Sequence, residues 1–226
     1  MTWRHLDTGP GEPAFNMGFD EALLESATAS ASPVLRFYSW TEPAATFGYF
    51  QKYAEIAAWT PLRPLIRRTT GGGLVPHEAD WTYSLVFPPT HPWYHLRASE
   101  SYLRLHQWLA RALVAADVPA ELALVGRKEI PGQCFAGAEQ FDVLLSGRKV
   151  AGAAQRRARE GLLIQGSVQS LPAGANRANW RTQMLICADA TWQVAWEKWS
   201  PPASFAERVR ELAAAKFSQT SHNQRR

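Results

Sequence analysis

The most informative stretch of the chain lies at residues 67–73, which read Arg67-Arg68-Thr69-Thr70-Gly71-Gly72-Gly73. Consecutive glycines let a backbone approach a ligand closely and adopt dihedral angles that other residues avoid. The two arginines before them offer permanently charged, forked donors for a carboxylate, a phosphate or a polarised carbonyl. Three glycines alone are typical of a sharp turn between strands. The flanking arginines, with His77 after the glycines, favour the wall of a binding pocket.

A second stretch, at residues 147–155, reads GRKVAGAAQ. Lys149 follows a Gly-Arg turn and leads directly into small and apolar residues. One interpretation is a surface lysine at the edge of a strand. The other is a lysine whose ammonium points at a ligand, because neighbours such as Gly152 and Ala153 leave it room. The residues alone leave both interpretations open.

The two cysteines of the chain differ in their surroundings. Cys134 lies in a glycine-containing loop, PGQCFAG, just before the same hairpin, whereas Cys187 lies between apolar residues typical of a core. A buried, inert cysteine is the usual state of this residue type. A nearby ammonium favours the thiolate, however, and so makes Cys134 a candidate nucleophile. No ligand set with metal spacing surrounds His77, and we expect no metal site.

Composition restricts the classes of protein to which the chain can belong. Its 226 residues, 46% hydrophobic, favour one domain over residues 1–217, followed by a polar tail at 218–226 that is expected to fray. The net charge is +4 and the basic residues are dispersed along the chain, which argues against nucleic-acid binding. No apolar run approaches the roughly 20 residues of a membrane span. The start of the chain lacks the apolar centre of a signal peptide, and we expect a cytoplasmic protein.

Hydrophobic periodicity predicts an α+β fold with a mixed, mostly antiparallel sheet packed by helices. Helices are predicted from a cap at Asn16 and over residues 99–116 and 205–217. A tight turn at Ser146-Gly147 is predicted to join two strands into a hairpin. The predicted strands cover residues 34–40, 45–50, 65–68, 82–87, 140–145, 149–154 and 162–168.

Residues 67–78 (RRTTGGGLVPHE) and 147–156 (GRKVAGAAQR) resemble two motifs of the lipoate-protein ligase A and octanoyltransferase family, which has the biotin/lipoate protein ligase catalytic domain. The resemblance runs to about residue 170, with further matches at residues 15–22, 35–40, 47–51 and 166–168. Two departures are Glu78, where Asp is usual, and Pro76, which removes a backbone donor.

The family resemblance implies an acyl tunnel beside the glycine motif. It implies catalytic roles for Cys134 and Lys149. It also implies that the substrate is bound by Arg67, Arg68, Gly71, Gly72, Gly73, His77, Gly152 and Ala153.

The resemblance implies one of two reactions. An octanoyltransferase takes octanoyl from octanoyl-acyl carrier protein, holds it as a cysteine thioester, and passes it to a lysine of a lipoyl carrier protein, without a cofactor. A lipoate-protein ligase instead activates free lipoate with ATP and Mg²⁺ as an adenylate. Cys134 precedes Lys149 by a short loop and strand, as in the cysteine-dependent octanoyltransferases, and this favours the transferase.

The acceptor implied in either case is the glycine cleavage H protein or an E2 lipoyl domain, with no nucleic acid or membrane partner. A non-catalytic carrier-binding module on the same fold is a third hypothesis. It is disfavoured because the Arg, Gly and Lys motifs are all intact.

Overall fold

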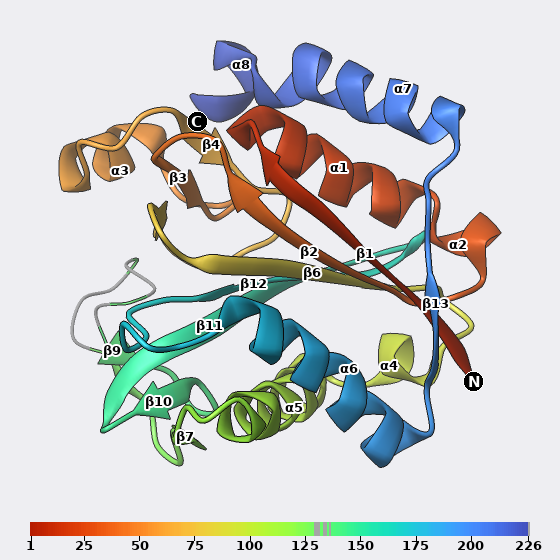
Figure 1. The fold of residues 1–226 in the computed structure, drawn as a ribbon. Helices are drawn as coiled ribbons and strands as arrows, with labels where there is room; N and C mark the ends of the chain where they lie inside the picture. The colour runs from red at the N-terminus through yellow and green to blue at the C-terminus, as the bar shows by residue number, and fades with distance from the viewer. Residues whose placement is uncertain (129–131, 133–134, 136, 226) are drawn as a thin grey trace.

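An eight-stranded sheet runs through the molecule (Figure 1), in a computed structural model that describes residues 1–128, 132, 135 and 137–225. Its strand β1 is parallel to both of its neighbours, and every other pairing is antiparallel. The prediction of a mixed, mostly antiparallel sheet is therefore confirmed. The strand order is β13 (Ala195–Lys198), β1 (Thr2–Gly11), β2 (Val34–Trp40), β6 (Trp81–Phe87), β12 (Gly161–Val168), β11 (Arg148–Ala158), β10 (Val143–Leu145) and β7 (Ala120–Leu122).

Helices cover the two faces of this main sheet (Figure 1). On one face lie α1 (Pro13–Glu25) and α7 (Ala203–Leu212), with α2 (Ala27–Ser30) after α1 and the π-helical η1 (Ala213–Phe217) after α7. On the other lie α5 (Ala98–Ala115) and α6 (Arg177–Trp192), with α4 (Pro92–His95) nearby. Because successive side chains of a strand point to opposite faces, each face has its own buried apolar cluster.

A smaller sheet of β4 (Leu65–Arg67), β3 (Ala44–Phe47) and β5 (Val75–His77) packs beside the first and carries α3 (Tyr53–Trp59). The glycine motif is the connection between β4 and β5. A two-stranded ribbon joins β8 (Arg127–Lys128) to β9 (Gly137–Ala138).

The predicted strands and the predicted helix at 99–116 all appear, with ends shifted by a few residues. The hairpin turn is confirmed, since Ser146 and Gly147 have φ of 50° and 75°, the left-handed pair that a type I′ two-residue hairpin requires. Asn16 is not a helix cap, because α1 begins at Pro13 and places Asn16 inside the helix. Helix α6 was not predicted, because its buried residues form only a narrow stripe of Trp180, Met184 and Ala188.

The C-terminal residues differ from the expectation of a fraying tail. They contain α8 (Thr220–Asn223), and Asn223 is buried. The cause is Arg67, whose guanidinium donates to the carbonyl oxygens of Asn223 at 3.1 Å and Arg225 at 2.9 Å. The side chain of Asn223 in turn accepts the backbone N–H of Arg67 at 2.9 Å. A buried cation with several carbonyl acceptors thereby fixes the end of the chain.

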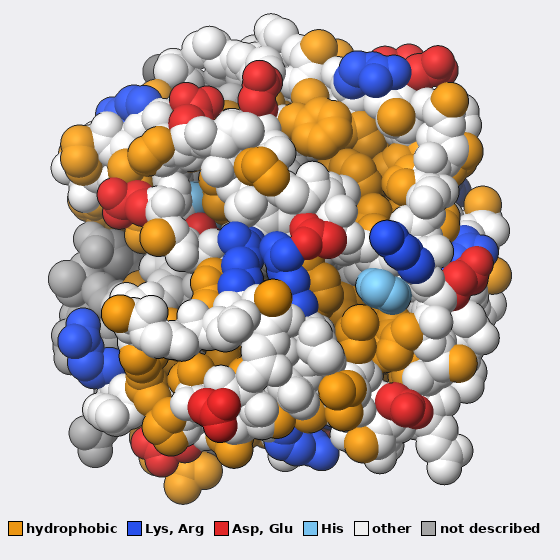
Figure 2. Space-filling view, viewed as in Figure 1, with side chains coloured by type: hydrophobic (Ala, Val, Ile, Leu, Met, Phe, Trp, Pro, Cys, Tyr) orange, Lys and Arg blue, Asp and Glu red, His pale blue; other side chains and the backbone are white. Residues whose placement is uncertain are grey.

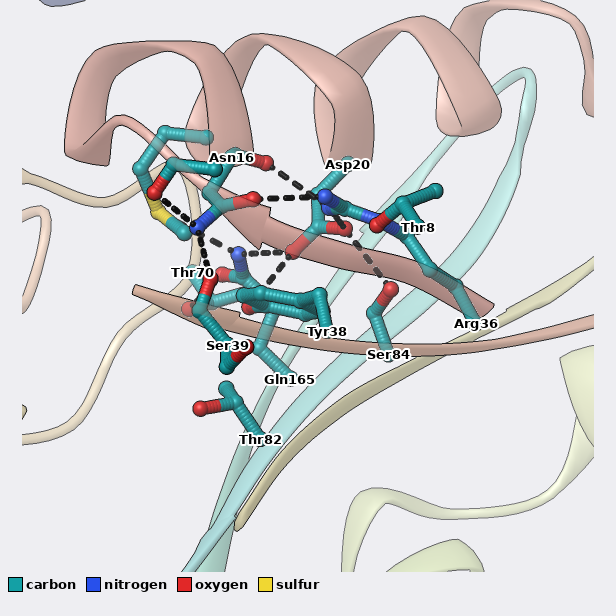
Figure 3. A network of polar contacts seen from close by, with 12 residues as sticks. Thr8, Asn16, Asp20, Arg36, Tyr38, Ser39, Thr70, Thr82, Ser84 and Gln165 are labelled. Carbon is teal, nitrogen blue, oxygen red and sulfur yellow. Dashed lines mark hydrogen bonds and ion pairs between the residues drawn. The ribbon is translucent and has the colours of Figure 1, made fainter. Parts of the chain in front are cut away.

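A buried ion pair joins α1 to the main sheet (Figure 3). Arg36 Nη1 lies 2.8 Å from Asp20 Oδ1, and the two side chains are 0% and 1% exposed. Asp20 also accepts hydrogen bonds from Ser84 at 2.7 Å and Tyr38 at 3.1 Å. Such complete pairing is what makes a buried charge tolerable, because an isolated one would lose its hydration without compensation.

We expect Asp20→Asn to lower the free energy of unfolding by about 3–5 kcal/mol, because it leaves the buried Arg36 charge without its counter-ion. Glu25→Gln on the same helix is the matched control, since its partner Arg208 is 48% exposed and the pair should contribute below about 1 kcal/mol. Urea unfolding of the three proteins measures both values. Equal losses for the two variants would contradict a special role for the Asp20 pair.

Candidate active site

A cavity of about 50 Å³ lies on the α1 face of the main sheet. The strand register brings Tyr38, Thr82, Ser167 and Gly152 into one row across β2, β6, β12 and β11. These four residues line the cavity together with Met17 of α1 and residues of the smaller sheet. Glycine and alanine on β11 leave space at the end of a face that is otherwise filled by side chains, and this space is the cavity.

The deep polar network of Figure 3 continues into this cavity through Gln165. Its amide donates to Asp20 at 2.8 Å and its oxygen accepts from Thr70 at 2.7 Å. Thr70 belongs to the RRTTGGG stretch, so the glycine motif, α1 and the main sheet meet at the Gln165 side chain.

A second and more polar cavity, of about 560 Å³, adjoins the first. Its described lining includes Gly72, Gly73, Tyr102 and Gln155. Lys149 and Ala153 line both cavities, so the lysine lies where an apolar space meets a polar one.

Lys149 is buried although it is a lysine, with a side chain only 5% exposed. A β-bulge aims it: Val143 pairs with Ala151 while Leu144 pairs with Lys149, which leaves Val150 as the extra residue. Gly152 makes room, because a Cβ there would lie 2.8 Å from Lys149 Cε and 2.9 Å from Nζ. Of the two interpretations of this lysine, its position agrees with the pocket and not with the surface.

Asp142 is the counter-ion of this lysine. Its Oδ2 lies 2.7 Å from Lys149 Nζ, and its side chain is 0% exposed. The Tyr102 hydroxyl donates to the other oxygen, Oδ1, and the Glu139 backbone N–H donates to Oδ2 at 2.6 Å. Neither side chain belongs to a motif that the sequence identifies. The one sequence signal for Asp142 is a single acid within the predicted strand 140–145, and Tyr102 lies on the apolar stripe of the predicted helix 99–116.

Glycine is required at one point of the motif loop and at one point of the chain that packs against it. Gly72 has a φ of 82°, and a Cβ on Gly48 would lie 1.9 Å from the Gly72 carbonyl oxygen. Arg68 braces the loop by donating to the carbonyl oxygens of Gly71 and Gly73, both at 2.9 Å.

The two arginines of the motif point in different directions. Arg68 lines the apolar cavity, whereas Arg67 donates to the carbonyl oxygens of Tyr49 and Gln51 and to C-terminal residues. Arg67 is therefore placed to hold backbone segments together, and it does not line either of the two cavities described above. Its predicted contact with a substrate has no counterpart in this geometry.

His77 lies in the wall of the apolar cavity, in contact with a buried carboxylate. Its Nδ1 is 2.8 Å from Asp80 Oδ2, its Nε2 is 2.8 Å from Thr46 Oγ1, and its ring stacks on Trp40 at 3.9 Å. Ser167 also donates to Asp80, at 2.7 Å. Burial raises the pKa of Asp80, but the adjacent His77 and the hydrogen bonds lower it more, so the pKa lies below its ordinary value.

Of the two cysteines, Cys134 lies outside the described residues. Cys187 is partly buried on α6 and packs against the core, and burial raises the pKa of its thiol.

In the described part of the chain, no three His, Cys, Asp or Glu side chains are grouped to hold a metal. No helix among these residues has the length and apolarity to cross a membrane. Charged side chains are scattered over the face in Figure 2, apart from one basic group near its centre.

Comparison with known proteins identifies the family. Residues 12–176 match the model of the lipoyl protein ligase A/B catalytic domain. The chain belongs to this family.

Relatives in the lipoyl ligase A/B family include the octanoyltransferases LipM of Carboxydothermus hydrogenoformans and Moorella thermoacetica, each 38% identical over 74% of this chain. The match covers 64% of the length of each relative. Among solved structures, a T. acidophilum protein described as a lipoate protein ligase, with bound lipoic acid, matches with a TM-score of 0.78 at 20% identity over 99% of both chains. The catalytic-domain fold predicted from the sequence is thereby confirmed.

We expect Asp80→Asn to destabilise the protein in a pH-dependent way. Because the folded-state pKa of Asp80 is depressed, its contribution to stability is complete above about pH 4, the ordinary pKa, and is lost as the pH falls through the folded value. The difference in unfolding free energy between the parent protein and the variant should therefore be largest near pH 7 and shrink below about pH 4. Urea unfolding from pH 7 to pH 3 measures it, with the exposed Asp189→Asn as control. A difference that stays constant over this range would show that Asp80 acts by packing alone.

Proposed function

We propose that this chain carries the catalytic site of an octanoyltransferase, which moves octanoyl from octanoyl-acyl carrier protein through a Cys134 thioester to a lysine of a lipoyl carrier protein. The observation that carries the proposal is the buried ammonium of Lys149 where the apolar cavity meets the polar one. The octanoyltransferase names of its 38%-identical relatives support it. The acceptor would be the glycine cleavage H protein or an E2 lipoyl domain, in the cytoplasm.

The apolar cavity has the lining of an acyl-chain site, and at about 50 Å³ it would have to widen to take a whole octanoyl chain. Met17, Trp40, Val75 and Ala154 contribute apolar surface to its lining. Burial of an alkyl chain is worth about 0.8 kcal/mol per methylene, so most of the binding free energy would come from this part of the substrate. The thioester carbonyl would then lie at the end of the cavity that holds Lys149.

In the first step, the Cys134 thiolate attacks the carbonyl carbon of the donor thioester. A new carbon–sulfur bond forms, the bond to the carrier's sulfur breaks, and the departing thiolate takes a proton from water. Phe135, the next residue in the sequence, lines the apolar cavity, and its ring centroid is 5.2 Å from Lys149 Nζ. A cation at this position stabilises both the attacking thiolate and the negative charge that develops on the carbonyl oxygen.

In the second step, the neutral amine of the acceptor lysine attacks the same carbonyl carbon. A carbon–nitrogen bond forms, Cys134 leaves as thiolate, and the surplus proton of the amine passes to water. Conversion of a thioester to an amide is downhill, and so the reaction needs neither ATP nor a metal. Backbone groups of Gly72 and Gly152 would lie beside the carbonyl, within a pocket wall that Arg68 and His77 brace.

Intact-mass measurement after incubation with octanoyl-acyl carrier protein, without an acceptor, tests the proposal directly. We expect one octanoyl group on the protein, labile to hydroxylamine. Cys134→Ser should lose both the adduct and turnover, because a serine hydroxyl is a far weaker nucleophile than a thiolate. Cys187→Ser, the matched control on α6, should keep both. Full activity of Cys134→Ser that depends on ATP and free lipoate would instead establish ligase chemistry.

We expect Lys149→Ala to lower the rate of octanoyl transfer about 10²–10³-fold, the usual cost of removing one preorganised electrostatic stabiliser. Arg148→Ala is the matched control, since it removes an exposed cation from the adjacent position of β11 and should change the rate little. Single-turnover measurements of adduct formation would report both effects. Similar rates for the two variants would remove Lys149 from the mechanism.

A further inference from the structure

Asp142 and Tyr102 lie directly behind Lys149, and neither belongs to the motifs that mark the site in the sequence. Asp142 precedes β10, and Tyr102 is on α5, so two separate elements converge on the lysine. The Asp142 carboxylate contacts Nζ at 2.7 Å with one oxygen and accepts the Tyr102 hydroxyl with the other. The Glu139 backbone N–H fixes the first oxygen from a third direction, at 2.6 Å.

This arrangement answers a physical problem that a buried lysine creates. Burial disfavours the charged form of a lysine and lowers its pKa, whereas an opposite charge within about 4–6 Å favours the charged form. A lysine side chain also has many rotamers, and ordering it costs entropy. The Asp142 carboxylate, held by two further donors, compensates for both effects because it offers a single charged partner at a fixed place.

We propose that Asp142 and Tyr102 are positioning residues, which keep the Lys149 ammonium charged and aimed at the junction of the two cavities. The inference rests on the proposed function only for its consequence in acyl transfer. Asp142 and Tyr102 would control the charge of Lys149 in any reaction at this site.

The pKa values of His106 and Tyr102, the titratable side chains of α5 beside Lys149, are shifted away from neutral pH. His106 of α5 is fully buried; burial, followed by the charge of Lys149, lowers its pKa to about 3. Burial and the neighbouring Asp142 raise the pKa of Tyr102 well above its ordinary value. Phe135 is apolar, and Glu139 contributes a backbone N–H while its side chain is exposed. Among the described residues, Asp142 is therefore the carboxylate on which the charge of Lys149 depends.

The test replaces Asp142 by the isosteric, uncharged asparagine. We expect the pKa of Lys149, measured by competitive labelling of its amine with mass-spectrometric readout, to fall by about 1–3 units in Asp142→Asn. The alkaline limb of the pH–rate profile for octanoyl transfer should move down by the same amount. Tyr102→Phe should shift both in the same direction by less, because it removes one of the hydrogen bonds to the carboxylate and leaves the carboxylate in place.

Tyr94→Phe is the matched control, since it also removes one tyrosine hydrogen bond, to the Ala158 carbonyl at 3.1 Å, away from Lys149. It should leave the labelling profile and the pH–rate profile unchanged. Circular dichroism checks that each variant folds. If Asp142→Asn does not fold, the Lys149 labelling profile of Tyr102→Phe decides the question. An unchanged Lys149 labelling profile in the folded variants would overturn the inference. A shifted labelling profile in a protein that never transfers octanoyl would uphold it while the proposed function fails.

Discussion

Burial of charge on one face of the main sheet is the constraint on which the rest of this structure depends. A buried charge costs several kcal/mol unless a partner and further hydrogen bonds compensate for its lost hydration. The sheet face toward α1 carries Arg36, and the end of the same face holds Lys149. Each is paired with an almost fully buried aspartate, Asp20 in the first case and Asp142 in the second. Packing of α1 and of the loop before β10 follows from the need to bring these aspartates into place.

The two ion pairs differ in what surrounds them, and this difference separates scaffold from site. Every charged nitrogen of Arg36 donates to a neighbour in the chain, to Thr8, Asn16 or Asp20, so that pair is closed. Lys149 instead lies at the meeting point of two cavities, with space left by Gly152. A charge that is held firmly on one side and open on the other can stabilise negative charge that develops in a reaction.

Local sequence was sufficient to predict the central strands of the main sheet and the hairpin, but not the short strands β5, β7, β8, β9 and β13. The glycines are informative because their role depends on backbone geometry, as the left-handed Gly72 shows. Arg67 could not be assigned in this way, because its acceptors include carbonyls at His222, Asn223 and Arg225, more than 150 positions along the chain. Asp142 could not be assigned for a related reason, because its role depends on a lysine in the next strand and a tyrosine on a helix distant in sequence. The role of Cys134 remains a prediction, outside the described residues.

The register of the β10–β11 hairpin decides which face of the main sheet Lys149 occupies. In a regular strand, residues 149 and 151 would share a face, and Ala151 is fully buried in the core on the α5 side. The bulge at Val150 breaks this alternation, so that Val150 and Ala151 both enter the core and Lys149 meets Asp142. A slip of one residue would move the side chain to the opposite face. The left-handed Ser146-Gly147 turn fixes the register, and so a two-residue turn determines where the charge of the site lies.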